Sequence, residues 1–352
     1  MSSHRCSIIR FFCEFAAAQT YCAWQMRRGL MWPLPQRGKW LLIVSFLTHS
    51  SVFGAPYRYV PFDVPGATST FLDGINNYGQ IVGRYSGPTG AGAFLYDGSA
   101  FIDLPAHNGD EVLPQDINEL GQIVGTLISE STIPGLLDTH GFLLDAGAFT
   151  VIDFPGATYT GIGGLNNLGE IVGGYTTSAG LGPGHGFSFD GTDFRSIDVP
   201  DAFSTQATGI NDSGRIVGAF HRDNLLFGTG YAFQNGQFEI LDTPFAQSLA
   251  PDDVNSSGVI AGTYLFSAFN SPFSGFVLDG PFVSLVHFPG AEETRVQGIN
   301  DHNHLIGTYR KFDGPFRGFI AYPVPEPTTL TFSMASMAVL AIIRRLRALT
   351  GR

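Results

Sequence analysis

Cysteine is scarce in this chain, and its few copies lie at one end. Of the 352 residues three are cysteines, Cys6, Cys13 and Cys22. Everything beyond residue 22 therefore lacks disulfide bonds, a thiol nucleophile and cysteine ligands for a metal. A domain in this part of the chain must be stabilised by its own hydrophobic core.

Basic residues are also few between residues 55 and 322. The chain has 19 lysines and arginines and 30 acidic residues, but ten of the basic residues and only two of the acidic ones lie outside this segment. The segment thus holds nine basic and 28 acidic residues, a formal charge of −19. Because nucleic acids are bound mainly by cations that neutralise phosphates, this charge disfavours nucleic acid and anionic lipid as partners. Divalent cations, neutral sugars and basic partners stay open.

The motifs of common enzymes are missing from the same segment. It contains no G-x-S-x-G elbow, phosphate loop, H-E-x-x-H pair or dinucleotide fingerprint. Sustained apolar spacing of 3.6 residues with helix caps is missing as well. The segment therefore predicts an all-β domain and identifies no catalytic residue.

Residues 1–54 predict an export signal. Arg37 and Lys39 precede the apolar stretch WLLIVSFLTHSSVFGA, which ends in small residues. A basic region, an apolar core and small residues are the layout of a secretory signal peptide. We expect cleavage between Gly54 and Ala55, and an uncleaved N-terminal membrane helix is the alternative.

Residues 323–352 contain three parts in a fixed order. They are a proline box (Val324, Pro325, Glu326, Pro327), an apolar run from Thr328 to Ile343, and a basic end (Arg344, Arg345, Arg347). The prolines keep the box extended, because they cannot continue a helix or a strand ladder. The apolar run would span about 24 Å as a helix, slightly less than the ~30 Å core of a bilayer. The arginines indicate that its end is cytoplasmic.

This tail resembles the PEP-CTERM sorting signal of Gram-negative bacteria. The resemblance implies that an exosortase, a membrane-embedded enzyme similar to cysteine transpeptidases, processes the tail. It also implies that the protein is exported through the inner membrane and reaches the cell surface or the medium. The alternative is a simple C-terminal membrane anchor.

Between the two ends, a motif of the form GINxxGxIVG occurs six times. Its central asparagines are 42, 48, 45, 44 and 45 residues apart, and they are Asn76, Asn118, Asn166, Asn211, Asn255 and Asn300. Each copy is followed by a Gly-aromatic strand, such as GAFLYDG from Gly92 or YAFQNG from Tyr231. A strand ending in proline comes next in five copies, such as IDLP from Ile102. Asn and Gly at these points suit tight turns between strands.

Four short strands per unit of about 45 residues predict the blades of a β-propeller. The sixth proline strand is missing after RGFIAY, and an equivalent, PFDVP from Pro61, precedes the first GIN motif instead. We therefore expect a six-bladed β-propeller over residues 55–322, in which the strand around Tyr57 to Val64 completes the last blade. This closure leaves no long sheet edge unpaired.

The repeats resemble the extracellular HAF-repeat group, in which GINxxGxIVG precedes a His-Ala-Phe-like tripeptide. Gly92-Ala93-Phe94 and His140-Gly141-Phe142 are near variants of that tripeptide. The resemblance implies a secreted, propeller-like module and carries over no catalytic residue.

Several polar residues are candidates for chemistry, although their repetition favours structural roles. Asp116-Asn118-Glu119 and Asp253-Asn255-Ser257 are similar to calcium loops but lack the distant bidentate glutamate. On a strand His302 and His304 would share one face, as metal ligands can. Their position matches the turn Asp-Ser-Gly of another copy, so we expect solvent-exposed loop histidines. We expect no metal and no other cofactor, and calcium is the alternative.

The residues next to the proline strands also repeat. Carboxylates meeting at the ring centre would suit polysaccharide cleavage, and four aspartates recur in register, Asp103, Asp153, Asp198 and Asp242. Their repetition again favours a structural role. His140 and His185 begin equivalent strands, and we expect them to pack or to bond backbone in the same way.

Together these observations predict a monomeric, non-catalytic module that binds or presents at the cell envelope or in its exopolysaccharide matrix. The loops 85–91 and 269–273 offer aromatic side chains for stacking on sugars. The alternative is a polysaccharide hydrolase or lyase with two or three non-repeated acids about 5 to 9 Å apart at the propeller mouth.

Overall fold

The computed structural model describes residues 57–88, 90–131, 137–178, 183–222, 228–241, 248–265 and 272–324. These residues form β-strands and turns and contain no helix. Accordingly, no described helix has the length and apolar character needed to cross a membrane. The predicted membrane segment from Thr328 to Ile343 lies outside the described residues.

The first repeat folds into the four strands that its motifs predict. They are β2 (Ser69–Ile75), β3 (Ile81–Gly87), β4 (Gly90–Tyr96) and β5 (Phe101–Asp103). The strands pair in chain order as an antiparallel sheet. The GIN turn joins β2 to β3, the IVG sequence begins β3, and the Gly-aromatic sequence forms β4.

The same order of strands recurs in four further groups of the described residues. They are β6 (Glu111–Ile117), β7 (Ile123–Glu130), β8 (Leu137–Asp145) and β9 (Ala148–Ile152); β10 (Tyr159–Leu165), β11 (Ile171–Thr176), β12 (His185–Phe189) and β13 (Phe194–Ile197); β14 (Ser204–Ile210), β15 (Ile216–His221), β16 (Thr229–Gln234) and β17 (Gln237–Leu241); β18 (Ser248–Val254), β19 (Ile260–Leu265), β20 (Ser274–Asp279) and β21 (Phe282–Val286). One parallel pair, Tyr159 with Thr139, joins the second and third groups into one eight-stranded sheet.

The last group contains the strand from the start of the repeat region. It consists of β22 (Glu293–Ile299), β23 (Leu305–Arg310), β24 (Phe316–Pro323) and β1 (Tyr57–Pro61), in the sheet order β1-β24-β23-β22. The register runs from Tyr57 opposite Pro323 to Pro61 opposite Phe319. The predicted pairing of the N-terminal strand with the last repeat is therefore confirmed.

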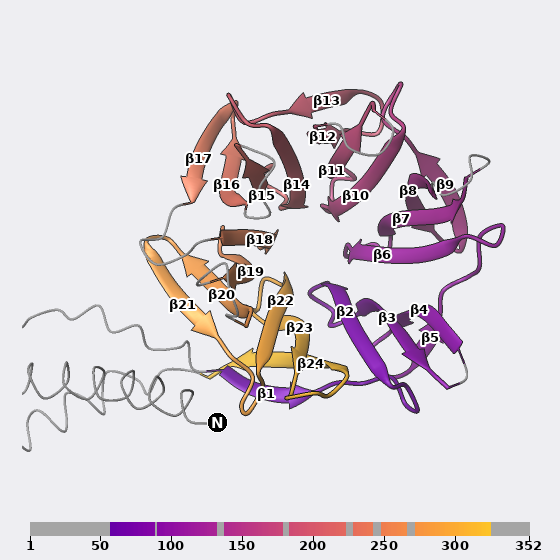
Figure 1. Cartoon of the computed structure of the whole chain (residues 1–352), viewed down its shortest axis with the longest axis vertical. Helices are drawn as coiled ribbons and strands as arrows, with labels where there is room; N and C mark the ends of the chain where they lie inside the picture. Colours follow the sequence, from indigo (N-terminus) through magenta and orange to yellow (C-terminus); the bar gives the residue numbers. More distant parts are fainter. Residues whose placement is uncertain are drawn as a thin grey trace, which may run out of the picture. The chain divides into compact units, whose positions relative to one another are not determined.

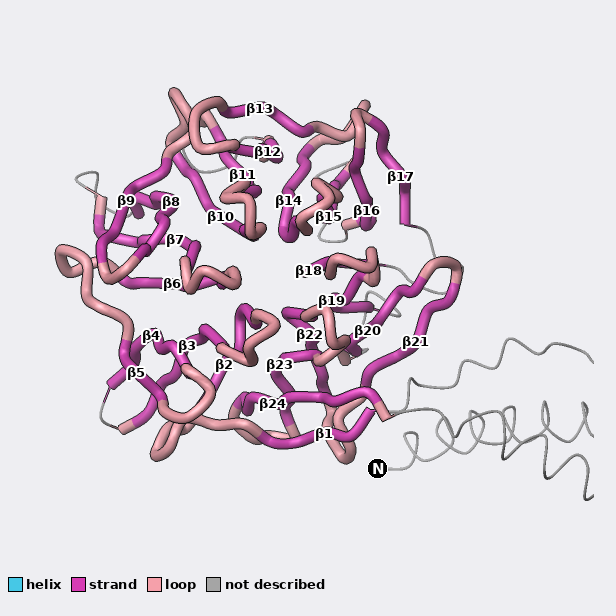
Figure 2. The backbone as a smooth tube through the Cα atoms, turned by 180° about the vertical axis from the view of Figure 1, so that it is seen from behind, coloured by secondary structure: helices cyan, strands magenta, loops and turns pink. Residues whose placement is uncertain are grey.

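The groups follow one another around a common axis, with β2, β6, β10, β14, β18 and β22 nearest to it (Figures 1 and 2). Six hydrophobic clusters each join one group to the next, and the last of them joins the final group to the first. In that cluster Ile306 of β23 packs with Leu72 and Ile75 of β2. Because the first and last groups share a core, the arrangement closes on itself.

The glycine in the middle strand's IVG-type sequence lies too close to the innermost strand of its group to carry a side chain. Gly83 pairs with Phe94, and a Cβ atom at Gly83 would lie 2.2 Å from the carbonyl oxygen of Phe71 and 2.8 Å from Cζ of Phe94. The equivalent ring in the fourth group belongs to Tyr231, which pairs with Gly218. The alignment of YAFQNG with GAFLYDG was therefore wrong by two residues, because it matched Phe233 to Phe94.

Each innermost strand contains a β-bulge at the same place, shortly before its asparagine. In the first group the register between β2 and β3 shifts between Leu72 and Gly74, which leaves Asp73 outside the ladder. The other five inner pairs shift at the equivalent position. A bulge frees one residue to direct its side chain independently of the ladder.

Candidate functional site

The repeated asparagines first shape their own turns. In the first copy Oδ1 of Asn76 accepts hydrogen bonds from the backbone N–H groups of Tyr78 and Gln80, at 3.1 and 3.0 Å. The same two bonds form in the other five copies. The turn glycine, Gly79 in this copy, has a φ of 75°, a conformation that glycine adopts without strain.

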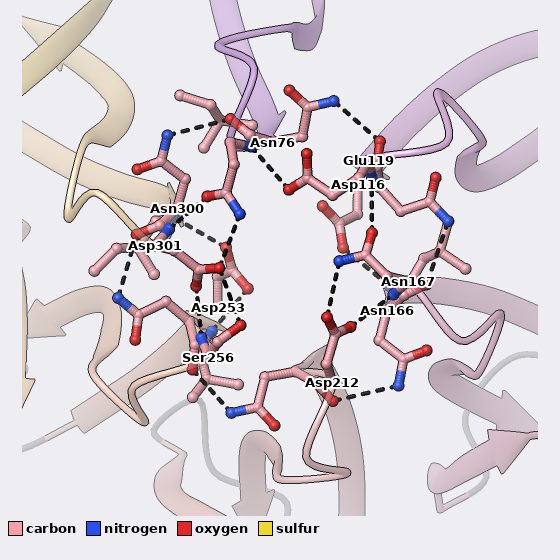
Figure 3. A pocket seen from close by; sticks show the side chains of 18 of the residues that line it. Asn76, Asp116, Glu119, Asn166, Asn167, Asp212, Asp253, Ser256, Asn300 and Asp301 are labelled. Carbon is pink, nitrogen blue, oxygen red and sulfur yellow. Dashed lines mark hydrogen bonds between the residues drawn. The ribbon is translucent and has the colours of Figure 1, made fainter.

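The Nδ2 atoms of the same asparagines link the groups into a closed ring (Figure 3). Each Nδ2 donates to the backbone carbonyl of the asparagine in the next group. The distances are 3.0 Å (Asn76 to Asn118), 3.3 Å (Asn118 to Asn166), 3.3 Å (Asn166 to Asn211), 2.8 Å (Asn211 to Asn255), 3.2 Å (Asn255 to Asn300) and 3.1 Å (Asn300 to Asn76). All six residues are buried. The structural role predicted for them is confirmed.

The residues that follow the asparagines form a second, more exposed tier. Backbone N–H groups in this tier donate to the next group's side chain at 2.7 to 3.0 Å, for example Asn77 to Glu119 and Asp301 to Asn77. Asp301 also accepts from the side chains of Asn77 and Ser256. Oε2 of Glu119 is buried and has no hydrogen-bond partner among the described residues. These acids are thus largely engaged by neighbouring groups.

Two carboxyl groups face the axis from groups on opposite sides of the ring. Asp116 accepts from the backbone N–H groups of Ile117 and Leu165, at 2.8 and 2.9 Å. Asp253 accepts in the same way from Val254 and Ile299, at 2.7 and 2.9 Å. Burial raises the pKa of Asp253 to about 6, and burial together with the negative charge of Asp253 raises the pKa of Asp116 well above its usual range.

The cavity on this axis is small. Its volume is about 60 Å³, and all six groups contribute to its lining. Since a water molecule needs roughly 10 to 15 Å³ by this measure, the cavity has room for a few waters and not for a sugar ring. The first residues of the two calcium-like sequences, Asp116 and Asp253, line this cavity. Both carboxylate oxygens of each residue accept hydrogen bonds from backbone N–H groups. Within the described ranges no three side chains of His, Cys, Asp or Glu form a group suited to hold a metal ion.

The aspartates of the proline strands do not meet at the axis. Asp103 ends β5, and Asp153 and Asp198 follow β9 and β13, the outermost strands of their groups. Asp153 bonds His140 at 2.7 Å, and Asp198 bonds His185 at 3.1 Å. The two histidines do behave alike, but they bond carboxylates and not backbone. Asp242 lies outside the described residues.

His302 lies in the turn between β22 and β23, and His304 directly precedes β23, so the two are loop residues and do not share the face of a strand. Their rings stack with centroids 5.5 Å apart, and the ring of His304 also contacts that of Tyr322 at 4.8 Å. Burial and the neighbouring His302 lower the pKa of His304. The pair is thus an aromatic contact at the end of the last group, with a neutral ring at His304 at pH 7.

A second cavity, which we call the lateral cavity, is larger than the axial one and lies beside the ring, between the first and second groups. Its volume is about 570 Å³, within the range of roughly 300 to 1,000 Å³ that small-molecule sites occupy. Its walls come from β3, β4 and β5, from the loop after β5, and from β6. Tyr85 and Ser86 of β3 and Ala91 of β4 contribute to the lining, so these residues of the predicted sugar-stacking loop 85–91 lie on strands. Of the second predicted loop, Phe273 is described, and Arg295 lies over its ring at 4.3 Å.

Arg84 is the main polar residue of this lateral cavity that the repeats did not reveal. Its Nε and Nη2 atoms both donate to the bulge residue Asp73, at 2.9 Å each. Burial raises the pKa of Asp73, and Arg84 opposes that rise. The sequence could have singled out Arg84, because it is the one charged residue at this position of the repeat. The other five copies carry Thr126, Gly174, Ala219, Thr263 and Thr308 there.

The two sorting signals cannot be placed. Val324 is the last described residue, and Pro325, Glu326, Pro327 and the three tail arginines lie outside the described residues, as do Gly54 and Ala55. Their roles stay predictions.

Comparisons with known proteins indicate a fold and no family. No family model and no curated protein matches the chain. A solved protein of unknown function from Dyadobacter fermentans DSM 18053 is 10% identical, with a TM-score of 0.51 over 77% of this chain and 100% of its own. TolB from Acinetobacter baumannii is 16% identical, with a TM-score of 0.45 over 74% of this chain and 65% of its own length. The β-propeller domain of the Trilobed protease from Pyrococcus furiosus is 9% identical, with a TM-score of 0.43 over 72% and 94%. The likeness concerns an all-β, propeller-like fold alone.

Proposed function

We propose that this protein is an exported, non-catalytic binding module built as a six-bladed β-propeller, each four-stranded group being one blade. Residues 1–54 direct export, and the tail 323–352 places the domain at the cell surface after recognition by an exosortase-type enzyme. The ligand is a component of the cell envelope or of the exopolysaccharide matrix. The domain acts as a monomer and needs no cofactor.

One observation carries the binding role. The repeated polar residues bond each other within the ring and along the outer strands. The lateral cavity of about 570 Å³ is lined, besides the repeated Asp103 and Pro105, by residues that differ among the repeats, such as Arg84 and Asp110. A closed ring does not need such a cavity at one of its six junctions. Its size and its mixture of apolar and polar walls suit a small ligand or a segment of a polymer.

The alternative is a polysaccharide hydrolase or lyase. It is favoured by three carboxylates that line the same cavity, Asp103, Asp110 and Glu111. Two of them are already engaged: Asp103 accepts from the hydroxyl of Tyr85 at 2.9 Å, and Asp110 bonds His107 at 2.7 Å. Because two of the three carboxylates have these partners, the geometry supports binding better than catalysis.

Retention on the host's own matrix polymer tests the proposal. The full chain is incubated with the immobilised polymer, and both retained protein and new reducing ends are measured. We expect retention without cleavage. New reducing ends would replace the binding role with the hydrolytic one, and absence of retention and cleavage would refute both.

The sorting role has its own test. Mass spectrometry of the C-terminus of the protein recovered from the cell surface and the medium should show that Arg344, Arg345 and Arg347 have been removed. An intact Arg352 on the released protein would exclude processing of the tail.

A further inference from the structure

The lateral cavity lies where the second repeat departs from the others, in the segment that leads from a proline strand into the next innermost strand. We call this segment, residues 104–110 between β5 and β6, the entry loop. In five copies the asparagine of the GIN motif follows the proline of the preceding proline strand by eleven positions, whereas Asn118 follows Pro105 by thirteen.

In four copies a threonine at the start of the innermost strand fixes the corresponding segment. Its Oγ1 accepts a hydrogen bond from the backbone N–H six residues earlier, as Thr70 does from Val64 at 3.1 Å. The second copy has Val112 and the fifth has Leu249 in that place, so the two extra residues are what sets the second copy apart.

The longer entry loop is held in one conformation by hydrogen bonds, a tight turn and an aromatic contact. His107 and Asp110 form a bridge in which the N–H of Asp110 donates to the carbonyl of His107 at 2.7 Å. Asn108 and Gly109 between them have φ angles of 48° and 91°, as a tight turn requires. The ring of His107 packs on Phe149 at 5.0 Å. The loop therefore supplies a fixed wall, which lowers the entropy cost of holding a ligand.

Hydrogen-bond donors and acceptors both face this cavity. Nε and Nη2 of Arg84 donate to Asp73, and Nη1 has no hydrogen-bond partner among the described residues. Ser86 can donate and accept, and Asp103 and Glu111 accept. The negative charge of a uronate would meet these carboxylates, and the positive charge of a free amine would meet the arginine. Hydroxyl groups, which donate and accept, match both.

The remaining lining is apolar. Leu104, Pro105, Val112 and Leu113 contribute side chains from the entry loop and β6, and Ala93 contributes from β4. A pyranose ring has the complementary character, because its C–H faces are apolar and its edge carries hydroxyls. A wall of this kind next to separate donors and acceptors is typical of sites that orient a small polar ligand.

We propose that the lateral cavity binds a neutral, polyhydroxylated saccharide segment, with hydroxyls directed to Arg84, Asp103 and Glu111. This inference rests on the proposed binding function and assigns that function to one junction of the ring. The chemistry selects uncharged sugar units over uronates and over amino sugars with free amines.

The experiment compares the full chain with two variants on immobilised neutral, uronate and free-amine oligosaccharides. Ala91→Trp fills the cavity from an exposed position on β4, and Ala148→Trp places the same side chain at an exposed position on β9 that does not line it. We expect binding to neutral members only, weakened at least about tenfold by Ala91→Trp and unchanged by Ala148→Trp. Because the ligand is neutral, the affinity should be the same at about 0.05 M and about 0.5 M salt.

The outcomes separate this inference from the general function. Preference for uronates or free amines, or a strong dependence on salt, overturns the neutral ligand. Equal binding by both tryptophan variants overturns the location. If the full chain is retained by the host matrix and no neutral member binds, the inference fails and the binding function stands. If nothing is retained, both fail. Unfolding of each variant is followed in parallel, so that a loss of fold is not counted as a loss of binding.

Discussion

Replacement of Asn76 by alanine is expected to destabilise the protein far more than its small change in size suggests. The Asn76 side chain is 3% exposed and makes four hydrogen bonds. Its Oδ1 accepts the two bonds that hold the GIN turn. Its Nδ2 donates to the side chain of Gln80 and to the carbonyl of Asn118 in the next group. Alanine removes all four and leaves two turn N–H groups and one carbonyl without these partners.

The magnitude follows from the number of bonds. A buried hydrogen bond contributes about 1 kcal/mol net, and a group left unsatisfied costs about 1 to 3 kcal/mol. Four bonds therefore predict a loss of about 3 to 5 kcal/mol in the free energy of unfolding. This loss is a large part of the roughly 5 to 15 kcal/mol that holds a typical domain together.

Urea unfolding of the full chain, followed by circular dichroism, measures the loss. Gln80→Ala is the matched control, because it removes one acceptor of Nδ2 and leaves the turn and the link to Asn118 in place. It should cost about 1 kcal/mol. If the two variants are equally stable, water replaces the bonds of Asn76, and the asparagine ring does not stabilise the fold as we argue.

Three further predictions concern closure, packing and pH. Deletion of residues 57–61 should expose the edge of β24 and cause aggregation on size-exclusion chromatography, because five paired residues are lost; replacement by a glycine linker should not restore the monomer. Gly83→Ala should lower the unfolding midpoint strongly in a thermal scan, since its Cβ would clash with the carbonyl oxygen of Phe71 at 2.2 Å and with the Phe94 ring, whereas Gly184→Ala, with its nearest neighbour at 3.7 Å, should not. Burial raises the pKa of Asp252 to about 8, so its protonated form is favoured by folding and its stabilisation is lost as pH rises from about 4 to 8. Asp252→Asn should remove this loss, up to about 1.4 kcal/mol per pH unit in urea titrations, and an unchanged slope would contradict the assignment.

The repeat pattern predicted much of the fold because each motif has a local physical meaning. The asparagine and glycine of the GIN motif are needed for the turn, and the glycine of IVG is needed because the backbone of the innermost strand lies so close. The missing sixth proline strand also predicted the pairing of β1 with β24, since an outer strand has to come from elsewhere in the chain. These inferences need only one repeat and the order of the motifs.

Contacts between repeats were not predictable in the same way. The link from Nδ2 of Asn76 to the carbonyl of Asn118 depends on how adjacent groups are placed, and no spacing within a repeat encodes that placement. The two-residue error in aligning YAFQNG had a similar origin. Both Tyr231 and Phe233 fit the aromatic position of the repeat, and the pairing with Gly218 decides between them. The lateral cavity lies where two residues are inserted, a departure that becomes meaningful once the junction is seen.

The β-bulge connects the shared fold to the individual site. Because the bulged residue lies outside the ladder, the ring tolerates different side chains there, and that side chain can reach the residue eleven positions later on the next strand. The pair is Asp73 with Arg84 in the first group, and Asp252 with Thr263 at 3.4 Å in the fifth. Only the first pair places a charged donor, and it does so at the junction where the entry loop is longer. A side chain fixed by a bulge and a wall fixed by a turn hold the lateral cavity open without support from the asparagine ring, so its chemistry can vary while the ring is kept.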